Sequence, residues 1–177
     1  MNLEASKPQI IFDTDPGLDD SLAMLWLFEL ARGGLVEIKA LTAVQGNTHS
    51  FNAFRNLVHL LNLTIGESFF EKNPNHLPIQ IGKYNPANGP QKFDDQFFGG
   101  DGFSGLSSKY LSDGCILTSN LEHVTLLHEL SPYSEELIVQ LLNKHPNELT
   151  VYFISSYDFK KKKKLMGNPF FFFFFFF

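Results

Sequence analysis

Four aspartates lie within eight residues near the amino terminus, and no other stretch of the chain is so rich in groups that could do chemistry. They are Asp13, Asp15, Asp19 and Asp20. Two unit charges about 4 Å apart repel each other by roughly 4 kcal/mol at an effective dielectric constant near 20. Four clustered carboxylates can relieve this repulsion in three ways: they spread into water, one of them holds a proton, or they bind a cation. Because carboxylate oxygens are hard ligands, the cation would be Ca²⁺ or Mg²⁺ rather than zinc.

A strand and a helix must position these carboxylates. The apolar run before Asp13 has the length of a short interior strand, which we expect at residues 9–13. The Pro16-Gly17 pair predicts a tight turn, because proline fixes φ and glycine tolerates a positive φ. Either of the last two aspartates is then expected to cap a helix over residues 21–31.

The strand and the turn together favour convergence of the four side chains. Asp13 and Asp15 are two residues apart, so on a continuing strand they point the same way. The turn then brings Asp19 and Asp20 back toward the end of the strand. The alternative is a solvated acidic turn with one helix cap, and charge spacing alone leaves both interpretations open.

Residues 13–20, which read DTDPGLDD, resemble the amino-terminal signature DTDPGxDD of the inosine-uridine preferring nucleoside hydrolases, and match it at every fixed position. A second match is the Gly46-Asn47 pair after the second predicted strand, where family members carry an asparagine that lines the nucleoside pocket. The resemblance covers residues 9 to about 156, roughly the first half of a family member. It favours the metal-site interpretation over the solvated turn.

The resemblance implies a hydrolase that splits the N-glycosidic bond of purine or pyrimidine ribonucleosides into ribose and a free base, with Ca²⁺ as cofactor. It implies that Asp15 is both a metal ligand and the general base, and that Asp20 is a bidentate metal ligand. Asp13 is expected to support the metal site, either as a direct ligand or through contact with a ligand. Asp19 is expected to hold the ribose hydroxyls, with Asn47 on the ribose side.

Strands and helices alternate along the rest of the chain, which predicts an α/β fold with a mostly parallel, Rossmann-like open sheet and flanking helices. The other predicted elements are a strand at residues 36–44, a helix at 50–63, a strand at 78–82, a helix starting with Ser131 as cap and Pro132 and ending near Lys144, and a strand at 149–154. Ligands of such sheets bind beyond the carboxyl ends of the strands, where Asp15 and Asn47 both fall.

Residues 83–114 form a long stretch rich in Gly, Asn and Asp, of a kind that often serves as a lid. Within it, residues 98–103 (FGGDGF) resemble the family's HGxDGL segment near the active site, with Phe98 where histidine is usual. We therefore assign no catalytic role to this segment and predict that Asp101 forms a turn. His49 is expected to be a solvated loop residue, and His123 and His128 to be structural.

Composition excludes several classes of partner. A net charge of −5 argues against nucleic acid, which binds a basic face. No apolar run is long enough to cross a membrane, and the polar start of the chain lacks a signal peptide. With Cys115 as the lone cysteine, we expect a cytoplasmic protein. The resemblance implies that it binds a ribonucleoside. The resemblance implies homo-oligomers for full-length family members.

The end of the chain departs from the family. We expect residues 1–156 to be the amino-terminal part of a nucleoside hydrolase domain, and residues 157–177 to be a disordered tail or a gene-model artefact. Five lysines at 160–164 and eight phenylalanines at 170–177 have no folding period. Family members continue instead with a Gly-Pro-Leu-Thr-Asn-like turn, and place another aspartate ligand and a histidine in their carboxy-terminal half. We therefore expect this chain to be inactive by itself.

Two alternatives from other classes stay open on the sequence. One is a phosphohydrolase of the haloacid dehalogenase type, which also has an Asp-x-Asp pair after its first strand, although that family lacks the Pro16-Gly17 turn. The other is a fragment that binds metal or ribose without catalysis.

Overall fold

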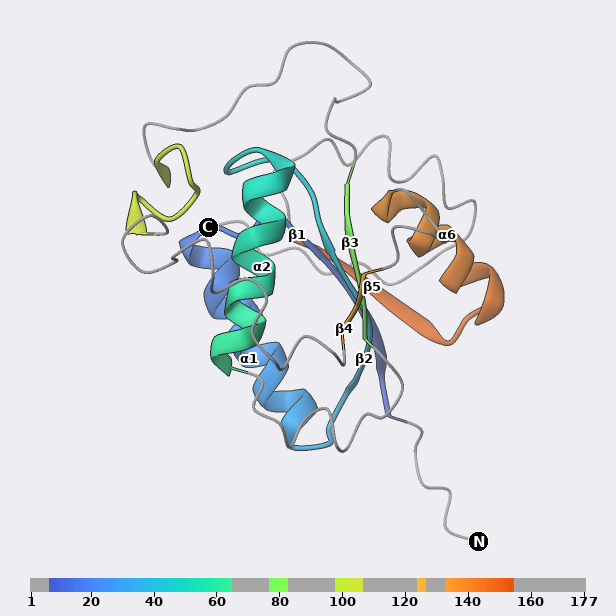
Figure 1. The fold of residues 1–177 in the computed structure, drawn as a ribbon. Coiled ribbons are helices and arrows are strands. Elements are labelled where there is room, and N and C mark those ends of the chain that lie inside the picture. The colour runs from blue at the N-terminus through green and yellow to red at the C-terminus, as the bar shows by residue number, and fades with distance from the viewer. Residues whose placement is uncertain (1–6, 65–76, 83–97, 107–123, 127–132, 155–177) are drawn as a thin grey trace, which may run out of the picture.

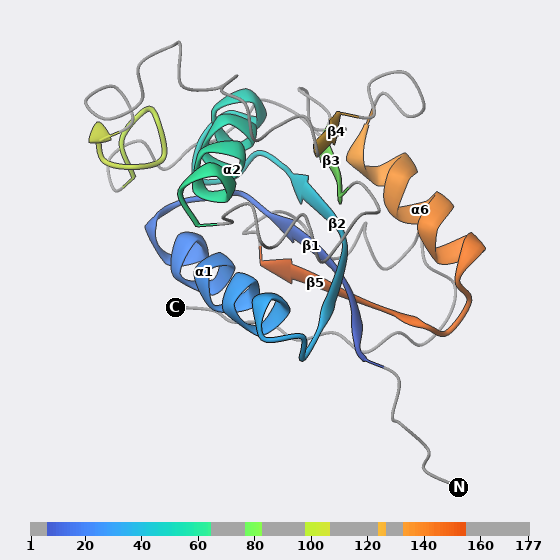
Figure 2. The same cartoon turned by 60° about the horizontal axis from the view of Figure 1, so that its bottom comes forward.

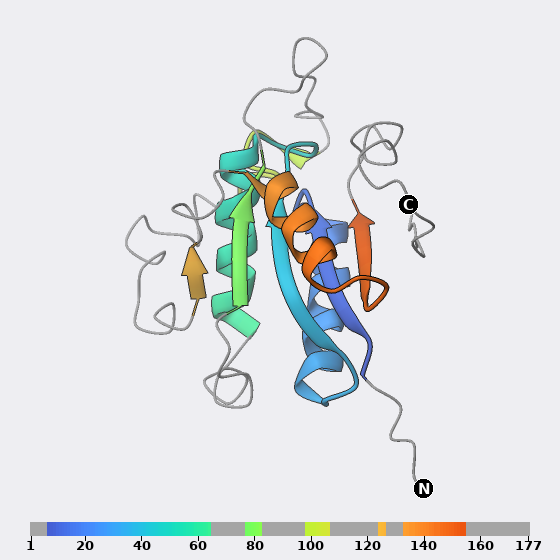
Figure 3. The same cartoon turned by 90° about the vertical axis from the view of Figure 1, so that its right-hand side faces the viewer.

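A parallel sheet forms the centre of the molecule. The computed structural model describes residues 7–64, 77–82, 98–106, 124–126 and 133–154. Its five strands are β1 (Gln9–Thr14), β2 (Glu37–Ala43), β3 (Leu77–Ile81), β4 (Val124–Leu126) and β5 (Leu149–Ile154). They lie in the order β4-β3-β2-β1-β5, and every neighbouring pair is parallel (Figures 1 and 3). The predicted mostly parallel open sheet is confirmed.

Helices cover both faces of this sheet. Helices α1 (Leu18–Arg32) and α2 (Ser50–Thr64) lie on one face, and α6 (Ser134–Lys144) lies on the other (Figures 2 and 3). Side chains of β1 divide between the two faces, because successive residues of a strand point to opposite sides. Ile10 and Phe12 pack with α1 and α2, whereas Ile11 packs with α6 and β5.

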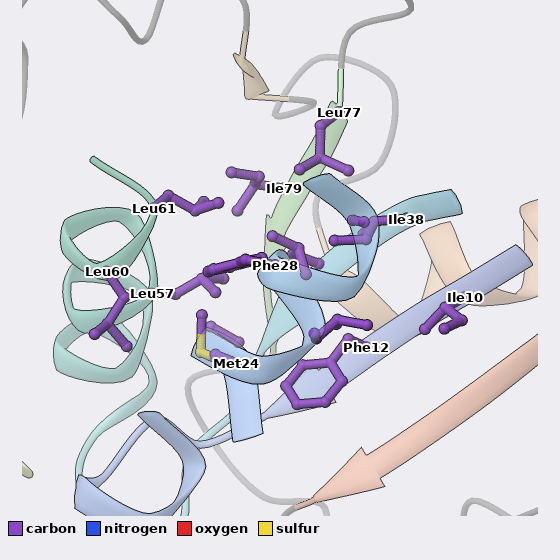
Figure 4. Close-up of a cluster of buried hydrophobic side chains, with 14 of the residues drawn as sticks. Ile10, Phe12, Met24, Phe28, Ile38, Leu57, Leu60, Leu61, Leu77 and Ile79 are labelled. Atoms are coloured by element: carbon purple, nitrogen blue, oxygen red, sulfur yellow. The ribbon is translucent and has the colours of Figure 1, made fainter. Parts of the chain in front are cut away.

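The first of these two cores is the larger, and it is built around the helices that follow β1 and β2. Figure 4 shows Met24 and Phe28 of α1 meeting Leu57 and Leu61 of α2. The apolar residues at helical spacing in α2 face the core as predicted: Leu57, Val58 and Leu61 are buried and Phe54 is partly buried. In α6 the expected Leu137, Ile138 and Leu142 are buried, and Leu141 packs against them.

The two helix starts differ from the prediction. Helix α1 begins at Leu18, three residues earlier than expected, with Gly17 as the N-cap residue. Asp19 and Asp20 therefore lie inside the first turn and the expectation that one of them is the N-cap is wrong, although the Gly17 N–H donates to Asp20 Oδ2 at 3.4 Å. Acidic residues there are stabilised by the helix dipole. Helix α6 begins at Ser134 with Tyr133 as N-cap, and the predicted start at residues 131–132 lies outside the described residues.

Strand β4 was not predicted, because three residues are too few to show a strand period. The expected helical and strand boundaries elsewhere agree within a residue or two. The tail at 157–177, Cys115, His123, His128 and most of the stretch 83–114 lie outside the described residues. Among the helices that are described, none is both long and apolar enough to span a membrane.

Candidate functional site

The acidic turn, residues 13–20, and the loop that carries Asn47 meet at one edge of the sheet. β1 and β2 are parallel neighbours, so both chains leave the sheet at the same edge. The pairing continues just past the strands, where the Val44 N–H donates to the Thr14 carbonyl at 2.9 Å. Asp15 and Asn47 are therefore brought together, as their positions after the two strands predicted.

Asn47 ties the end of β1 to the first turn of α1. Its backbone N–H donates to Asp15 Oδ2 at 2.9 Å. Its side-chain Nδ2 donates both to the Asp15 carbonyl and to Asp20 Oδ2, each at 3.0 Å. One asparagine thus fixes two aspartates from different elements, and all three residues are buried.

The four aspartates do not share one environment. Asp13, Asp15 and Asp20 are 1%, 1% and 2% exposed, whereas Asp19 is exposed. Asp13 Oδ1 accepts a hydrogen bond from Thr42 Oγ1 of β2 at 2.6 Å. Asp20 Oδ1 accepts one from Thr14 Oγ1 at 2.8 Å. The alternative of a merely solvated turn does not hold, because three of the four carboxylates lie inside the protein.

Burial raises the pKa of the Asp20 carboxyl from its ordinary 3.8 to about 6. The hydrogen bond from Thr14 opposes that shift, and the neighbouring charge of Asp19 adds to it. The donors to Asp20 that the structure shows are Thr14, the Gly17 N–H and Asn47, none of which carries a positive charge. The ionised carboxylate is therefore only partly compensated, and a cation beside it would be favourable.

A hard divalent cation fits these residues in donor chemistry, since the buried side chains supply carboxylate oxygens. Within the described part of the chain, however, no three or more His, Cys, Asp or Glu side chains are grouped so as to hold a metal ion. Asp13 Oδ1 is bonded toward β2, and Asp19 is exposed. Asp15 and Asp20 are the two buried carboxylates that Asn47 links.

We expect the metal-free protein to lose stability as the pH rises toward 7. Because the pKa of Asp20 is about 6 in the folded chain and 3.8 ordinarily, the stabilisation from its protonation is complete below pH 3.8 and is lost as the pH rises through 6. This linkage lowers the free energy of unfolding by about 1 kcal/mol between pH 5 and pH 7. Urea unfolding in the presence of a chelator measures it. Asp20→Asn cannot ionise and should lose this part of the pH dependence; the same pH dependence in both proteins would contradict the raised pKa.

Residues 98–106 lie against the acidic turn. Asp101 Oδ1 accepts the backbone N–H groups of Phe103 and Gly105, each at 2.9 Å, which confirms that Asp101 forms a turn. A Cβ placed on Gly17 would lie 3.3 Å from Phe98 Cδ1, so Phe98 packs beside the turn. The expectation for His49 is wrong, because this side chain is half-buried in the loop after β2.

Three polar residues that bind this segment, Thr48, Asn52 and Asn56, were not predicted from the sequence. They lie four residues apart, with Thr48 just before α2 and Asn52 and Asn56 within it, where residues at that spacing share one helix face. A polar stripe of this kind was the available signal, beside the apolar stripe that predicted the helix.

Comparison with known proteins shows which family this chain resembles over most of its length. The sequence model of a family described as inosine-uridine preferring nucleoside hydrolase matches residues 10–157. Two proteins of Oryza sativa subsp. japonica, "Probable uridine nucleosidase 1" and "Probable uridine nucleosidase 2", are 34% identical over 106 residues and 27% identical over 146 residues. The alignments cover 59% and 82% of this chain, but 29% and 36% of those proteins. The chain thus spans about a third of the length of these relatives, less than the half that the resemblance led us to expect.

Solved structures share the fold. A plant nucleoside hydrolase superposes with a TM-score of 0.58 at 22% identity, over 84% of this chain and 39% of that one. An inosine-guanosine nucleoside hydrolase gives 0.55 at 21% identity, over 85% of this chain and 39% of that one. At this identity the likeness to solved structures shows the fold alone. The family is shown by the sequence match over residues 10–157. The chain belongs to the inosine-uridine preferring nucleoside hydrolase family.

Proposed function

We propose that this chain carries the metal- and ribose-binding half of a site that cleaves the N-glycosidic bond of ribonucleosides to give ribose and a free base. The observation that carries the proposal is the junction of Asp15, Asp20 and Asn47, in which one asparagine binds two buried aspartates at the carboxyl ends of two parallel strands. Family membership supports it, as do the plant relatives described as uridine nucleosidases.

Members of the family are metal-dependent enzymes, and we propose Ca²⁺ as the ion here. Asp15 and Asp20 would hold it, with Asp13 in support through its bond to Thr42. When bound, the ion supplies positive charge that makes a nearby water easier to deprotonate.

The residues of this chain then have separate tasks. Asp15 accepts the proton of the attacking water as general base, which requires it to be ionised at the working pH. Asp19 is exposed and able to accept hydrogen bonds from ribose hydroxyls, while Asn47 borders the ribose. The negative charge of these carboxylates stabilises the oxocarbenium-like transition state that develops as the bond to the base breaks.

We propose that the 177 residues alone do not turn over substrate. The chain spans 29% and 36% of its two rice relatives and 39% of each of the two solved structures. By resemblance, a further aspartate ligand and the acid that assists the leaving base belong to the part of family members that this chain does not span.

The test compares this chain with the product of the full transcript, once sequencing has established the reading frame beyond codon 156. A product of family length is expected to release ribose from inosine or uridine, and the 177-residue chain is expected to release none. A phosphatase assay on the same samples separates this activity from the haloacid dehalogenase alternative. Hydrolysis by the short chain would refute the proposed division of the site, and a family-length product inactive on every ribonucleoside tested would refute the function.

A further inference from the structure

Thr48, just before α2, and two asparagines within α2 hold residues 98–106 through backbone carbonyl groups. Thr48 Oγ1 and Asn52 Nδ2 both donate to the Gly100 carbonyl, at 2.8 and 3.1 Å. One helical turn further on, Asn56 Nδ2 donates to the Asp101 carbonyl at 2.9 Å. The segment is therefore bound by two side chains of α2 and by Thr48 just before that helix.

Asn56 differs from the other two because it also reaches the acidic turn. The same Nδ2 donates to the Pro16 carbonyl at 3.0 Å, and the side chain is 1% exposed. An amide nitrogen has two hydrogens, so one group can serve both carbonyls. Pro16 is the residue directly after Asp15, and its carbonyl belongs to the peptide that leads to Gly17.

We propose that Asn56 is a positioning residue that couples the placement of residues 98–106 to the geometry of the acidic turn. Its meaning for catalysis rests on the proposed function, whereas the coupling itself does not. If the Asp101 carbonyl moves, the Asn56 amide that is bonded to it must move or lose that bond. The same amide holds the Pro16 carbonyl, which lies between Asp15 and the first turn of α1. A polar link buried this deeply is lost only at the cost of leaving a carbonyl without its donor.

Close packing of Gly102 against Thr48 and the Asn56 amide strengthens the coupling. A Cβ on Gly102 would lie 2.9 Å from Thr48 Cγ2 and 3.1 Å from Asn56 Nδ2. Phe98 gives a second contact with the turn, since it packs beside Gly17. The segment thus touches the acidic turn through Asn56 and directly through Phe98.

Two glycines of the segment provide a matched pair of variants. Gly102 and Gly105 both have φ of 81°, so alanine brings the same backbone strain at either position. Only the methyl group at Gly102 presses on Thr48 and Asn56, because a Cβ at Gly105 has nothing within 4 Å. Gly102→Ala therefore disturbs the link, and Gly105→Ala is the control.

Amide hydrogen exchange in a chelating buffer reads the coupling without metal or nucleoside. The reporters are the Ser21 N–H, which donates to the Gly17 carbonyl at 3.1 Å, and the Asn47 N–H on Asp15. We expect Gly102→Ala to speed exchange at both by roughly fivefold, the effect of losing one net hydrogen bond, and Gly105→Ala to leave both unchanged. Amides of α6 should stay protected in both variants, since a general loss of stability would speed them as well.

A second pair acts on the helix itself. Asn56→Leu removes the link, whereas Asn52→Leu removes only bonds to Gly100 and Thr48. We expect the first to speed exchange at Ser21 and Asn47 and the second to spare them. If Asn56→Leu does not fold, the comparison of Gly102→Ala with Gly105→Ala alone tests the coupling. Equal exchange at the two reporters in both glycine variants would overturn the coupling. Absence of Ca²⁺ binding by the parent chain would count against the proposed function and leave the exchange result standing.

Discussion

Replacing Gly17 by alanine is expected to lower the free energy of unfolding by about 2 kcal/mol, through overpacking and a broken buried hydrogen bond. A Cβ at this position would lie 2.4 Å from Asn47 Nδ2 and 3.1 Å from Asn47 Cγ. The asparagine cannot move away freely, because that nitrogen donates to the Asp15 carbonyl and to Asp20 Oδ2. The backbone at Gly17 has a φ of −109°, so the expected loss comes from the collision and not from backbone strain.

Urea unfolding of Gly17→Ala and Gly33→Ala measures this effect. Gly33 is the C-cap residue of α1 with a φ of −71°, and the nearest atom to a Cβ there is the Glu29 carbonyl oxygen at 3.4 Å, an ordinary contact. We expect Gly33→Ala to change stability by less than about 0.5 kcal/mol. If the two variants unfold at the same urea concentration, Asn47 is not held where the structure places it.

Local sequence was enough to predict β1, β2, β3 and β5, the helices α1, α2 and α6, and the meeting of Asp15 with Asn47. β1 and β2 are adjacent and parallel, so residues that follow them meet at one edge, and the order of elements along the chain already implied this. The apolar stripes of α2 and α6 were equally local, since burial at helical spacing needs no partner to be known.

The direction of each carboxylate could not be predicted in the same way, because its partners are distant in sequence. Asp13 is bonded to Thr42, 29 residues away, and the Pro16 carbonyl to Asn56, 40 residues away. An octapeptide pattern gives residue types and spacing, whereas these bonds depend on how α2 and β2 pack against the turn. The start of α1 was predicted too late, because aspartate is a common N-cap residue and the sequence alone does not show the backbone conformation. In the structure Gly17 has the extended backbone of the N-cap residue.

Asp20→Ala is expected to weaken Ca²⁺ binding by tenfold or more, of order 1.4 kcal/mol. Asp20 is a buried carboxylate, and the hydrogen-bond donors that the structure shows for it are neutral. Burial raises its pKa to about 6. A cation is therefore stabilised more by this carboxylate than by an exposed one. Asp20→Asn, which keeps the size of the side chain, should weaken binding in the same direction. Glu29→Ala is the control, because it removes one negative charge from the exposed end of the same helix.

Titration calorimetry of Ca²⁺ into the 177-residue chain and these three variants, above pH 7 where Asp20 is ionised, tests the metal assignment most directly. We expect weak binding by the parent, unchanged binding by Glu29→Ala, and at least a tenfold loss in Asp20→Ala, on the order of 1.4 kcal/mol. Equal Ca²⁺ affinity in Asp20→Ala and the parent chain would contradict the assignment of the acidic turn as the metal site.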